Sequence, residues 1–341
     1  MRISPSVGAA LAAALVVICP SPARAQIYEE VSTRAQGMSG AFVAVADDAT
    51  ATWWNPAGIA TGALFSVVFE KGRVTQPETV TDLAPARRSA VTGFAMAFPS
   101  LGLNYYRLRV SQIGAIGPIA PGAQDRQELG ESGRQVQALA TSQLGITLAQ
   151  SLGDHLVVGT TLKLVRGGVA SAIAGASTDP LDFGDDLEVD FQKHGDLDVG
   201  AMLKFSHARA GLTVRNVREP EFGEGANRLT LKRQARAGFA ILASPTGALA
   251  GLTVSGDADL TRTATLFGDV RHVATGVEAW LVNRRLGIRG GVAANTIGDR
   301  RPSTSTGVSA AVISSLYIEA ARTFGSDGSL RGWSSTVRIT F

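Results

Sequence analysis

The chain has 341 residues, of which 45% are hydrophobic and 18% are charged. Its 32 basic and 29 acidic side chains give a formal net charge of +3, and removing a leader that contains Arg2 and Arg24 leaves 30 against 29, a balance that gives no argument for a nucleic-acid partner. Cys19 is the single cysteine, so a chain that loses its leader has no disulfide and needs a large core or a closed barrel.

The first 25 residues predict a signal peptide. Arg2 supplies a positive charge, and Val7 to Ile18 form an apolar run that is too short to span a bilayer as a helix. Ala23-Arg24-Ala25 is a small-x-small cleavage site, so we expect the mature chain to begin at Gln26. Cys19 raises the alternative of a lipoprotein, but Ile18 before it is not the small residue that lipidation needs. The chain is therefore expected to be exported.

Beyond residue 60, apolar residues alternate with small or polar ones, which is the period of two expected of strands. No later segment has 18 apolar residues in a row, so any membrane span must be a strand. The alternation predicts about fourteen strands, near 62–74, 89–98, 101–111, 136–151, 154–167, 195–206, 208–218, 231–243, 249–262, 271–283, 285–295, 303–313, 315–325 and 331–341.

The links between these strands alternate in length. Short links such as Pro99-Ser100 and Gly153 follow every second strand, and long ones such as 112–135 and 168–194 lie between them. This pattern is typical of an outer-membrane barrel with long loops facing outward, because lipid offers the backbone no hydrogen bonds and the strands must close on themselves. The sequence therefore predicts an all-β protein, an antiparallel transmembrane β-barrel in a Gram-negative-type bacterium. A soluble β-sandwich stays an alternative, since aromatic residues make up only 6% of the chain.

The C-terminus fits the same interpretation. Val337, Ile339 and Phe341 alternate with polar residues, and the chain stops at the aromatic ring. An amphipathic last strand that ends on Phe341 resembles the C-terminal signal by which barrel-assembly machinery recognises its clients. That machinery and the outer-membrane lipid are therefore expected partners.

Residues 34–60 form a segment of a different kind, rich in small residues and turn formers. Asp47 and Asp48 are capping residues, Asn55-Pro56 favours a turn, and Gly58 permits positive φ. The other positions that we single out here are Gly37, Gly40 and Ala57, and the adjacent Trp53 and Trp54 are candidate ligand contacts, although aromatic residues beside a barrel wall more often serve as packing anchors.

This stretch resembles the N-terminal region of the long-chain fatty-acid transporter (FadL) superfamily and of its PorV/PorQ and TraF-like relatives. The match runs almost continuously from Arg34 to Ala60, and Ser39 departs from it where the family usually has Gly. The resemblance implies a fourteen-stranded barrel whose N-terminal segment fills the lumen as a plug or hatch. The expected organisation is a signal peptide at 1–25, a plug at 26–61 and a barrel at 62–341.

The resemblance leaves two functions open. The favoured hypothesis is a PorV-like barrel that supports secretion as a docking or scaffold barrel for secreted protein cargo, because the loops are modest and polar. The alternative is a FadL-like transporter that takes up a hydrophobic small molecule, a long-chain fatty acid or a hydrocarbon. The identity of ligand or cargo, the mobility of the plug and the oligomeric state stay open.

The sequence gives no argument for an enzyme, a cofactor or a metal. The four histidines are scattered, and no nucleophile elbow or phosphate loop is present in the sequence. Acidic residues at Asp182, Asp185, Asp186, Glu188 and Asp190 could bind calcium, but their spacing is not that of an EF-hand, and a solvated loop is favoured. Inward-facing charges at Asp257, Asp259, Glu278, Arg289 and Arg338 are expected to form ion pairs in a polar lumen.

Overall fold

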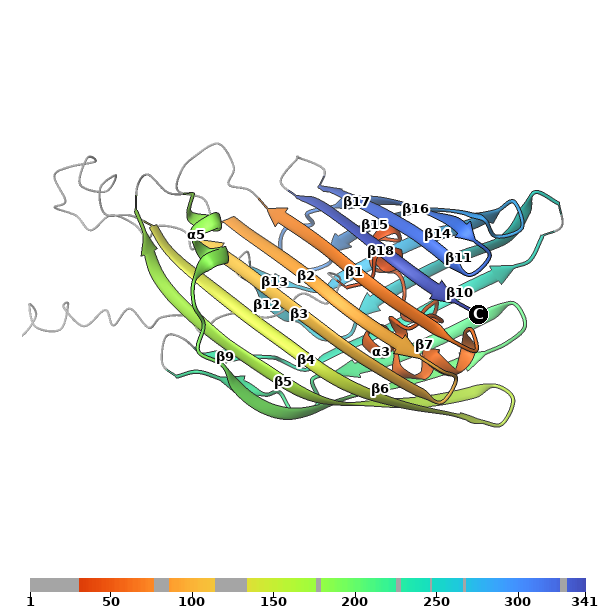
Figure 1. Ribbon diagram of the computed structural model, residues 1–341, viewed down its shortest axis with the longest axis horizontal. Coiled ribbons are helices and arrows are strands. Elements are labelled where there is room, and N and C mark those ends of the chain that lie inside the picture. Colours follow the sequence, from red (N-terminus) through yellow and green to blue (C-terminus); the bar gives the residue numbers. More distant parts are fainter. Residues whose placement is uncertain are drawn as a thin grey trace, which may run out of the picture.

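The protein is a closed antiparallel β-barrel of fourteen strands, as predicted (Figure 1). The computed structural model describes residues 31–76, 86–113, 134–175, 179–224, 228–245, 247–265, 268–325 and 330–341. Neighbouring barrel strands pair in sequence order, and the last closes on the first. The barrel strands are β1 (Ser66–Gln76), β2 (Ala86–Ala97), β3 (Leu101–Ile113), β4 (Arg134–Leu152), β5 (Leu156–Ala174), β6 (Gln192–Lys204), β7 (Ala208–Arg215), β10 (Gln234–Ala243), β11 (Leu249–Asp259), β14 (His272–Leu281), β15 (Leu286–Asn295), β16 (Ser303–Ile313), β17 (Leu316–Gly325) and β18 (Arg331–Thr340).

Most strand positions place apolar residues on the outer surface and polar residues inside. Inward apolar residues such as Val68 and Tyr106 lie where the wall meets the N-terminal segment. On β4, Leu144, Ile146 and Leu148 are exposed on the outside, whereas Gln143 and Thr147 are buried toward the lumen. An exposed apolar belt over a polar interior is the arrangement of a barrel that faces lipid. Among the described residues, no helix is long and apolar enough to cross a membrane.

Strand lengths differ from the predicted ones at a few places. The first strand begins at Ser66 and not at 62, because the short 3-10 helix η2 (Pro56–Thr61) is followed by bends over residues 62–65 before the chain enters the wall. β4 and β5 are longer than predicted and reach Arg134 and Ala174, so they rise beyond the neighbouring strands at the long-loop end. The alternation of short turns and long links is confirmed. We call the two rims the short-turn end and the long-loop end.

The described part of the N-terminal segment before the first strand begins inside the barrel, where residues 31–59 are almost all buried (Figure 1). Residues 61–65 then lead to β1, with Leu64 exposed. The segment contains α2 (Thr33–Gly37), α3 (Ala51–Trp54) and η2. α2 packs on β16 and β17, while η2 packs on β4, β5 and β6 on the other side of the lumen. The predicted signal peptide, residues 1–25, lies outside the described residues.

Three structured pieces lie in the long links. The helix α5 (Pro180–Asp186) packs on the outer surface of β2, β3 and β4 at the long-loop end (Figure 1). The hairpin of β8 (Glu221–Phe222) and β9 (Leu229–Thr230) turns inward, where Phe222 and Leu229 pack with inward-facing residues such as Val165. A second hairpin joins β12 (Thr263–Thr265) to β13 (Gly268–Val270).

Candidate functional site

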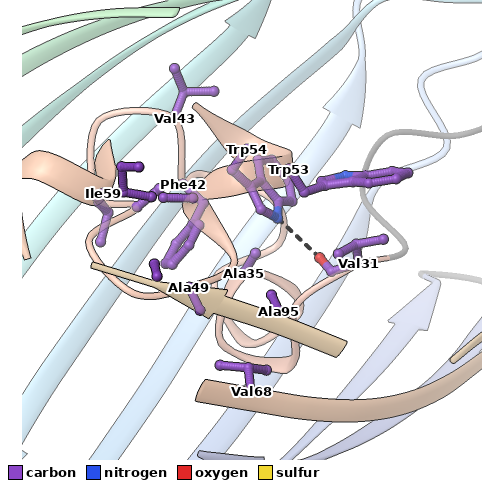
Figure 2. Close-up of a cluster of buried hydrophobic side chains, with 14 of the residues drawn as sticks. Val31, Ala35, Phe42, Val43, Ala49, Trp53, Trp54, Ile59, Val68 and Ala95 are labelled. Atoms are coloured by element: carbon purple, nitrogen blue, oxygen red, sulfur yellow. Dashed lines mark hydrogen bonds between the residues drawn. The ribbon is translucent and has the colours of Figure 1, made fainter. Parts of the chain in front are cut away.

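The N-terminal segment and the barrel wall share one hydrophobic core, to which Val68 of β1 and Ala95 of β2 contribute (Figure 2). Phe42, Trp53 and Trp54 are fully buried, and the rings of Phe42 and Trp54 meet edge to face with centroids 5.8 Å apart. Trp54 Nε1 donates a hydrogen bond of 3.0 Å to the carbonyl of Val31, which ties the end of α3 to the start of the segment. The segment is therefore a compact body and not an extended strap.

Trp53 connects this body to the barrel wall. Its ring contacts Tyr106 of β3 edge to face at 5.2 Å, and the guanidinium of Arg215 on β7 lies 3.5 Å from its centroid. Both tryptophans thus act in packing, and neither lines the cavity described below. Their role as ligand contacts stays an untested prediction.

Arg34 of α2 is the main ionic link between segment and wall. Its Nε and Nη2 donate to the two carboxylate oxygens of Glu278 on β14 at 2.8 and 2.6 Å. Its Nη1 bonds Asp47 at 2.5 Å and Asp48 at 3.3 Å. Burial alone would raise the pKa of the Asp47 carboxyl, but Arg34 and Arg209 stabilise the charged form more, so that pKa lies below its ordinary value.

The ion pairs continue along the wall. Arg289 Nε bonds Glu278 at 2.6 Å and its Nη2 lies 3.7 Å from Glu319, which in turn bonds Arg338 at 2.8 Å. All of these side chains are buried and face the lumen, as do Asp257 and, less completely, Asp259. The lumen on this side is therefore filled by a charged ladder that alternates in sign, as the sequence predicted.

Two wall carboxylates bind the segment through its backbone. Glu70 of β1 accepts hydrogen bonds from the amide of Ser32 at 3.0 and 2.9 Å. Asp257 of β11 accepts from the amides of Phe42 and Val43, both at 2.8 Å. Through these hydrogen bonds the wall holds the segment at both ends of its first half.

The Asn55-Pro56 turn lies against the opposite wall. Asn55 caps η2 by accepting from the amide of Ala57, and its Nδ2 donates to the carbonyls of Val43 and Ala201. Gly200 is the wall residue that the turn contacts. A Cβ at this position would lie 2.1 Å from Asn55 Oδ1, so only glycine leaves room for the turn. The turn forms as predicted, and it is placed by backbone contact with β6.

The predicted glycines have related roles. A Cβ at Gly58 would lie 2.1 Å from the carbonyl oxygen of Ala46, and Gly37 touches the backbone of Gly307 on β16. Gly40 has φ 87°, and Ser39, which replaces the family's usual Gly, has φ 54°. This left-handed conformation costs a side-chain-bearing residue about 1–2 kcal/mol. Ser39 and Gly40 form the surface of the segment that faces the long-loop end, and only Ser39 carries this cost.

A cavity of about 220 Å³ lies at that surface. Gln36, Ser39 and Gly40 form its floor, and the long-loop ends of β1, β2, β10, β11 and β14 to β17 form its wall. Arg87 and Arg236 line it together with small side chains such as Ala293, Ser305 and Thr323. Within the described residues, the Ser39 hydroxyl is buried and has no hydrogen-bond partner. The hairpin β8–β9 occupies the other side of the lumen, next to β5 and β6.

The acidic residues of the long link after β5 are more ordered than a solvated loop. Asp185 accepts from Ser111 at 2.6 Å and from Arg88 at 3.2 Å, and Arg88 also pairs with Asp182. These carboxylates therefore hold α5 to the outer wall. In the described ranges, no group of three or more His, Cys, Asp or Glu residues could hold a metal ion.

The sequence placed two of the segment's wall anchors, Asp257 and Glu278, inside the barrel, but it did not identify Arg34 or Glu70. Arg34 lies inside the N-terminal motif, and Glu70 lies in the first strand, but neither was singled out. The only sequence signal for Glu70 is an acidic residue at an inward position of a strand. Such residues are common in a polar lumen, so this signal does not distinguish an anchor. The C-terminal residues Val337 and Phe341 are exposed on the outer surface, and their role as an assembly signal stays a prediction.

The model of the family described as F plasmid transfer operon, TraF, protein matches residues 67–259, which is more than half of the chain and runs from β1 to β11. The chain belongs to this TraF family. A search of curated proteins finds no match.

Solved structures with the same fold are FadL-like channels. The CymD monoaromatic hydrocarbon channel shares 12% identity and a TM-score of 0.60, over 93% of this chain and 99% of that one. The Ralstonia pickettii toluene transporter TbuX is 13% identical with a TM-score of 0.57, over 92% of this chain and 99% of that one. A Pseudomonas aeruginosa FadL homologue is 12% identical with a TM-score of 0.56, over 94% of this chain and 100% of that one. At these identities the likeness establishes a FadL-like barrel fold for this TraF-family chain.

Proposed function

We propose that the protein is an outer-membrane channel that takes up a small, largely apolar molecule and performs no chemistry on it. The single observation that carries this proposal is the cavity at the long-loop end, whose floor is the N-terminal segment. A ligand that enters from outside would meet Gln36, Ser39 and Gly40 before it could pass further. The segment, residues 26–61, would then act as the hatch.

The size of the cavity narrows the ligand class. An apolar cavity of about 150 Å³ holds one benzene molecule, and the cavity here has about 220 Å³. A single-ring compound or a short hydrocarbon fits, whereas an extended long-chain fatty acid does not fit as a whole. The named substrates of CymD and TbuX-type channels, monoaromatic hydrocarbon and toluene, are of this size.

Uptake of labelled toluene tests the proposal. We would express the chain in a Gram-negative host that lacks its own hydrophobic-uptake channel and compare it with empty vector and with two variants. Ser39→Leu fills the cavity floor and is expected to abolish most of the uptake, while Ser100→Leu, on the exposed turn between β2 and β3, is expected to leave it unchanged. A mobility shift on boiling would verify that each barrel is closed. Uptake by the parent chain no faster than the vector contradicts the proposal.

A second candidate function is the docking or scaffold barrel that the sequence favoured. The buried ion pair between Arg34 and Glu278 supports it, because this pair ties the segment to the barrel wall. The TraF family description, of a transfer operon protein, is also compatible with a role in a larger machine. The transport proposal is preferred because the solved relatives of this fold are channels. Co-purification of a secreted protein with the barrel, without toluene uptake, would reverse this preference.

A further inference from the structure

Six outward-facing residues form one row across the wall of β1 to β6, which faces the viewer in Figure 1. The strand register places each member directly opposite the next: Lys71, Thr92, Arg107, Ser142, Arg166 and Lys193. We call these residues the cation row. It holds four cations and two hydroxyls and no carboxylate.

The two rows next to the cation row on the short-turn side are apolar on β1 to β5. The row next to the cation row consists of Phe69, Phe94, Tyr105, Leu144 and Leu164, and the one after it of Val67, Met96, Leu103, Ile146 and Leu162. These surfaces suit acyl chains. The cation row thus marks the edge at which the lipid-facing surface ends and head groups begin.

Cations further toward the long-loop end already have partners within the protein. Arg88 pairs with Asp182 and Asp185 of α5, and Arg109 donates to the carbonyls of Gly184 and Leu187. α5 therefore covers the wall on the long-loop side of the cation row. It supplies carboxylate or carbonyl partners to the cations that it touches, Arg88 and Arg109.

Among the residues that the structure describes, the cation row has no anionic partner. In the described part of the chain, no carboxylate forms an ion pair with Lys71, Arg107 or Lys193, and Arg166 stacks its guanidinium on Phe191 at 4.1 Å. Arg166 and Lys193 are also a direct cross-strand pair of like charge, an arrangement that destabilises a sheet. An external anion that lies between them would remove this repulsion.

We propose that the cation row binds the phosphate groups of a phosphorylated glycolipid in the outer leaflet. Lys and Arg make charge-assisted hydrogen bonds to phosphate oxygens, and Thr92 and Ser142 can add hydroxyl donors. Neighbouring strands lie about 4.8 Å apart, so the row is wide enough to contact two phosphates of one head group while its acyl chains lie on Phe69 and Tyr105. The inference rests on the outer-membrane location in the proposed function, but not on transport.

Native mass spectrometry of the purified full chain in detergent tests this assignment. The probes are bis-phosphorylated lipid A, phosphatidylglycerol and phosphatidylcholine. We expect lipid A to bind more tightly than either phospholipid, and binding to weaken as ionic strength rises. Lys71→Gln/Arg107→Gln is expected to lower lipid A affinity roughly 25-fold, about fivefold for each cation.

A matched variant controls for the loss of two charges. Arg284→Gln/Arg285→Gln lies in the exposed turn between β14 and β15 at the short-turn end and should bind lipid A like the parent chain. Lys71→Arg/Arg107→Lys keeps both charges and should also keep binding, and a mobility shift on boiling verifies folding of all three. If the parent chain binds phosphatidylglycerol as tightly as lipid A, or binds lipid A independently of salt, the inference is wrong. Failure to take up toluene would leave these binding results intact and would count against the channel function alone.

Discussion

Replacing Arg34 by Met should release the N-terminal segment from the wall without opening the barrel. The substitution keeps much of the side-chain volume but removes both bonds to Glu278 and those to Asp47 and Asp48. Removing one partner of a buried ion pair costs about 3–5 kcal/mol. Glu278 keeps Arg289 at 2.6 Å, so we expect the lower end of that range, which corresponds to a shift of roughly 150-fold in the docking equilibrium.

Hydrogen exchange in the purified barrel measures this shift. The amides of residues 32–62 should exchange faster in Arg34→Met, while strand amides keep their protection and the band still shifts on boiling. Glu278→Gln should speed exchange in the same residues. Because both variants break the same contact, the loss of docking free energy in the double variant should be clearly smaller than the sum of the losses in the two single variants.

Either of two results would refute this reasoning. Unchanged exchange in Arg34→Met would mean that packing around Trp53 and Trp54 holds the segment and that the ion pairs contribute nothing to docking. Additive losses in the double variant would mean that Arg34 and Glu278 act independently, in spite of their two hydrogen bonds.

Three further predictions concern the same segment. Gly291→Val places a Cβ 2.4 Å from the backbone carbon of Met38, so it should weaken docking of the segment by about 1–3 kcal/mol. Gly290 faces outward and its nearest neighbour is 4.0 Å away, so Gly290→Val should leave docking unchanged. Equal exchange of the segment amides in the two variants would contradict the close contact. Ser39→Gly relieves a left-handed conformation that costs about 1–2 kcal/mol, offset by about 0.5–1 kcal/mol of added chain entropy, so segment amides should exchange up to severalfold more slowly, and faster exchange would argue against strain at this position. Because the pKa of Asp47 is lowered in the folded protein, its contribution is present above the unfolded value of about 4 and disappears as pH falls through the lower folded value. The difference in segment exchange between the parent chain and Asp47→Asn should therefore stay constant from neutral pH down to about pH 4, and a difference that shrinks within that range would show that Asp47 does not act as a charged group.

Much of the barrel could be predicted from the sequence. Period-two alternation gave fourteen strands, and strands such as β3, β16 and β17 begin within one residue of the predicted position. The inward orientation of Glu278, Arg289 and Arg338 followed from the same alternation. Alternation is a local property that each strand displays by itself, which is why it survives without knowledge of the neighbours.

The candidate site depended on contacts that the sequence does not display. Arg34 and Glu278 are 244 residues apart in sequence, and the cavity combines the floor of the segment with the ends of eight strands. The Asn55-Pro56 turn was predicted, but its contact with Gly200 was not.

The sequence by itself determined the strands, their number and which face of each strand meets lipid, because these follow from residue type and a period of two. Only the tertiary structure decided which inward residues meet the N-terminal segment and which outward residues align in the cation row. The cation row depends on the register of consecutive strands, which aligns residues from Lys71 of the first strand to Lys193 of the sixth. The anchors depend also on closure of the barrel around the segment. A local pattern specifies neither register nor closure, so the row and the anchors appear only in the folded barrel.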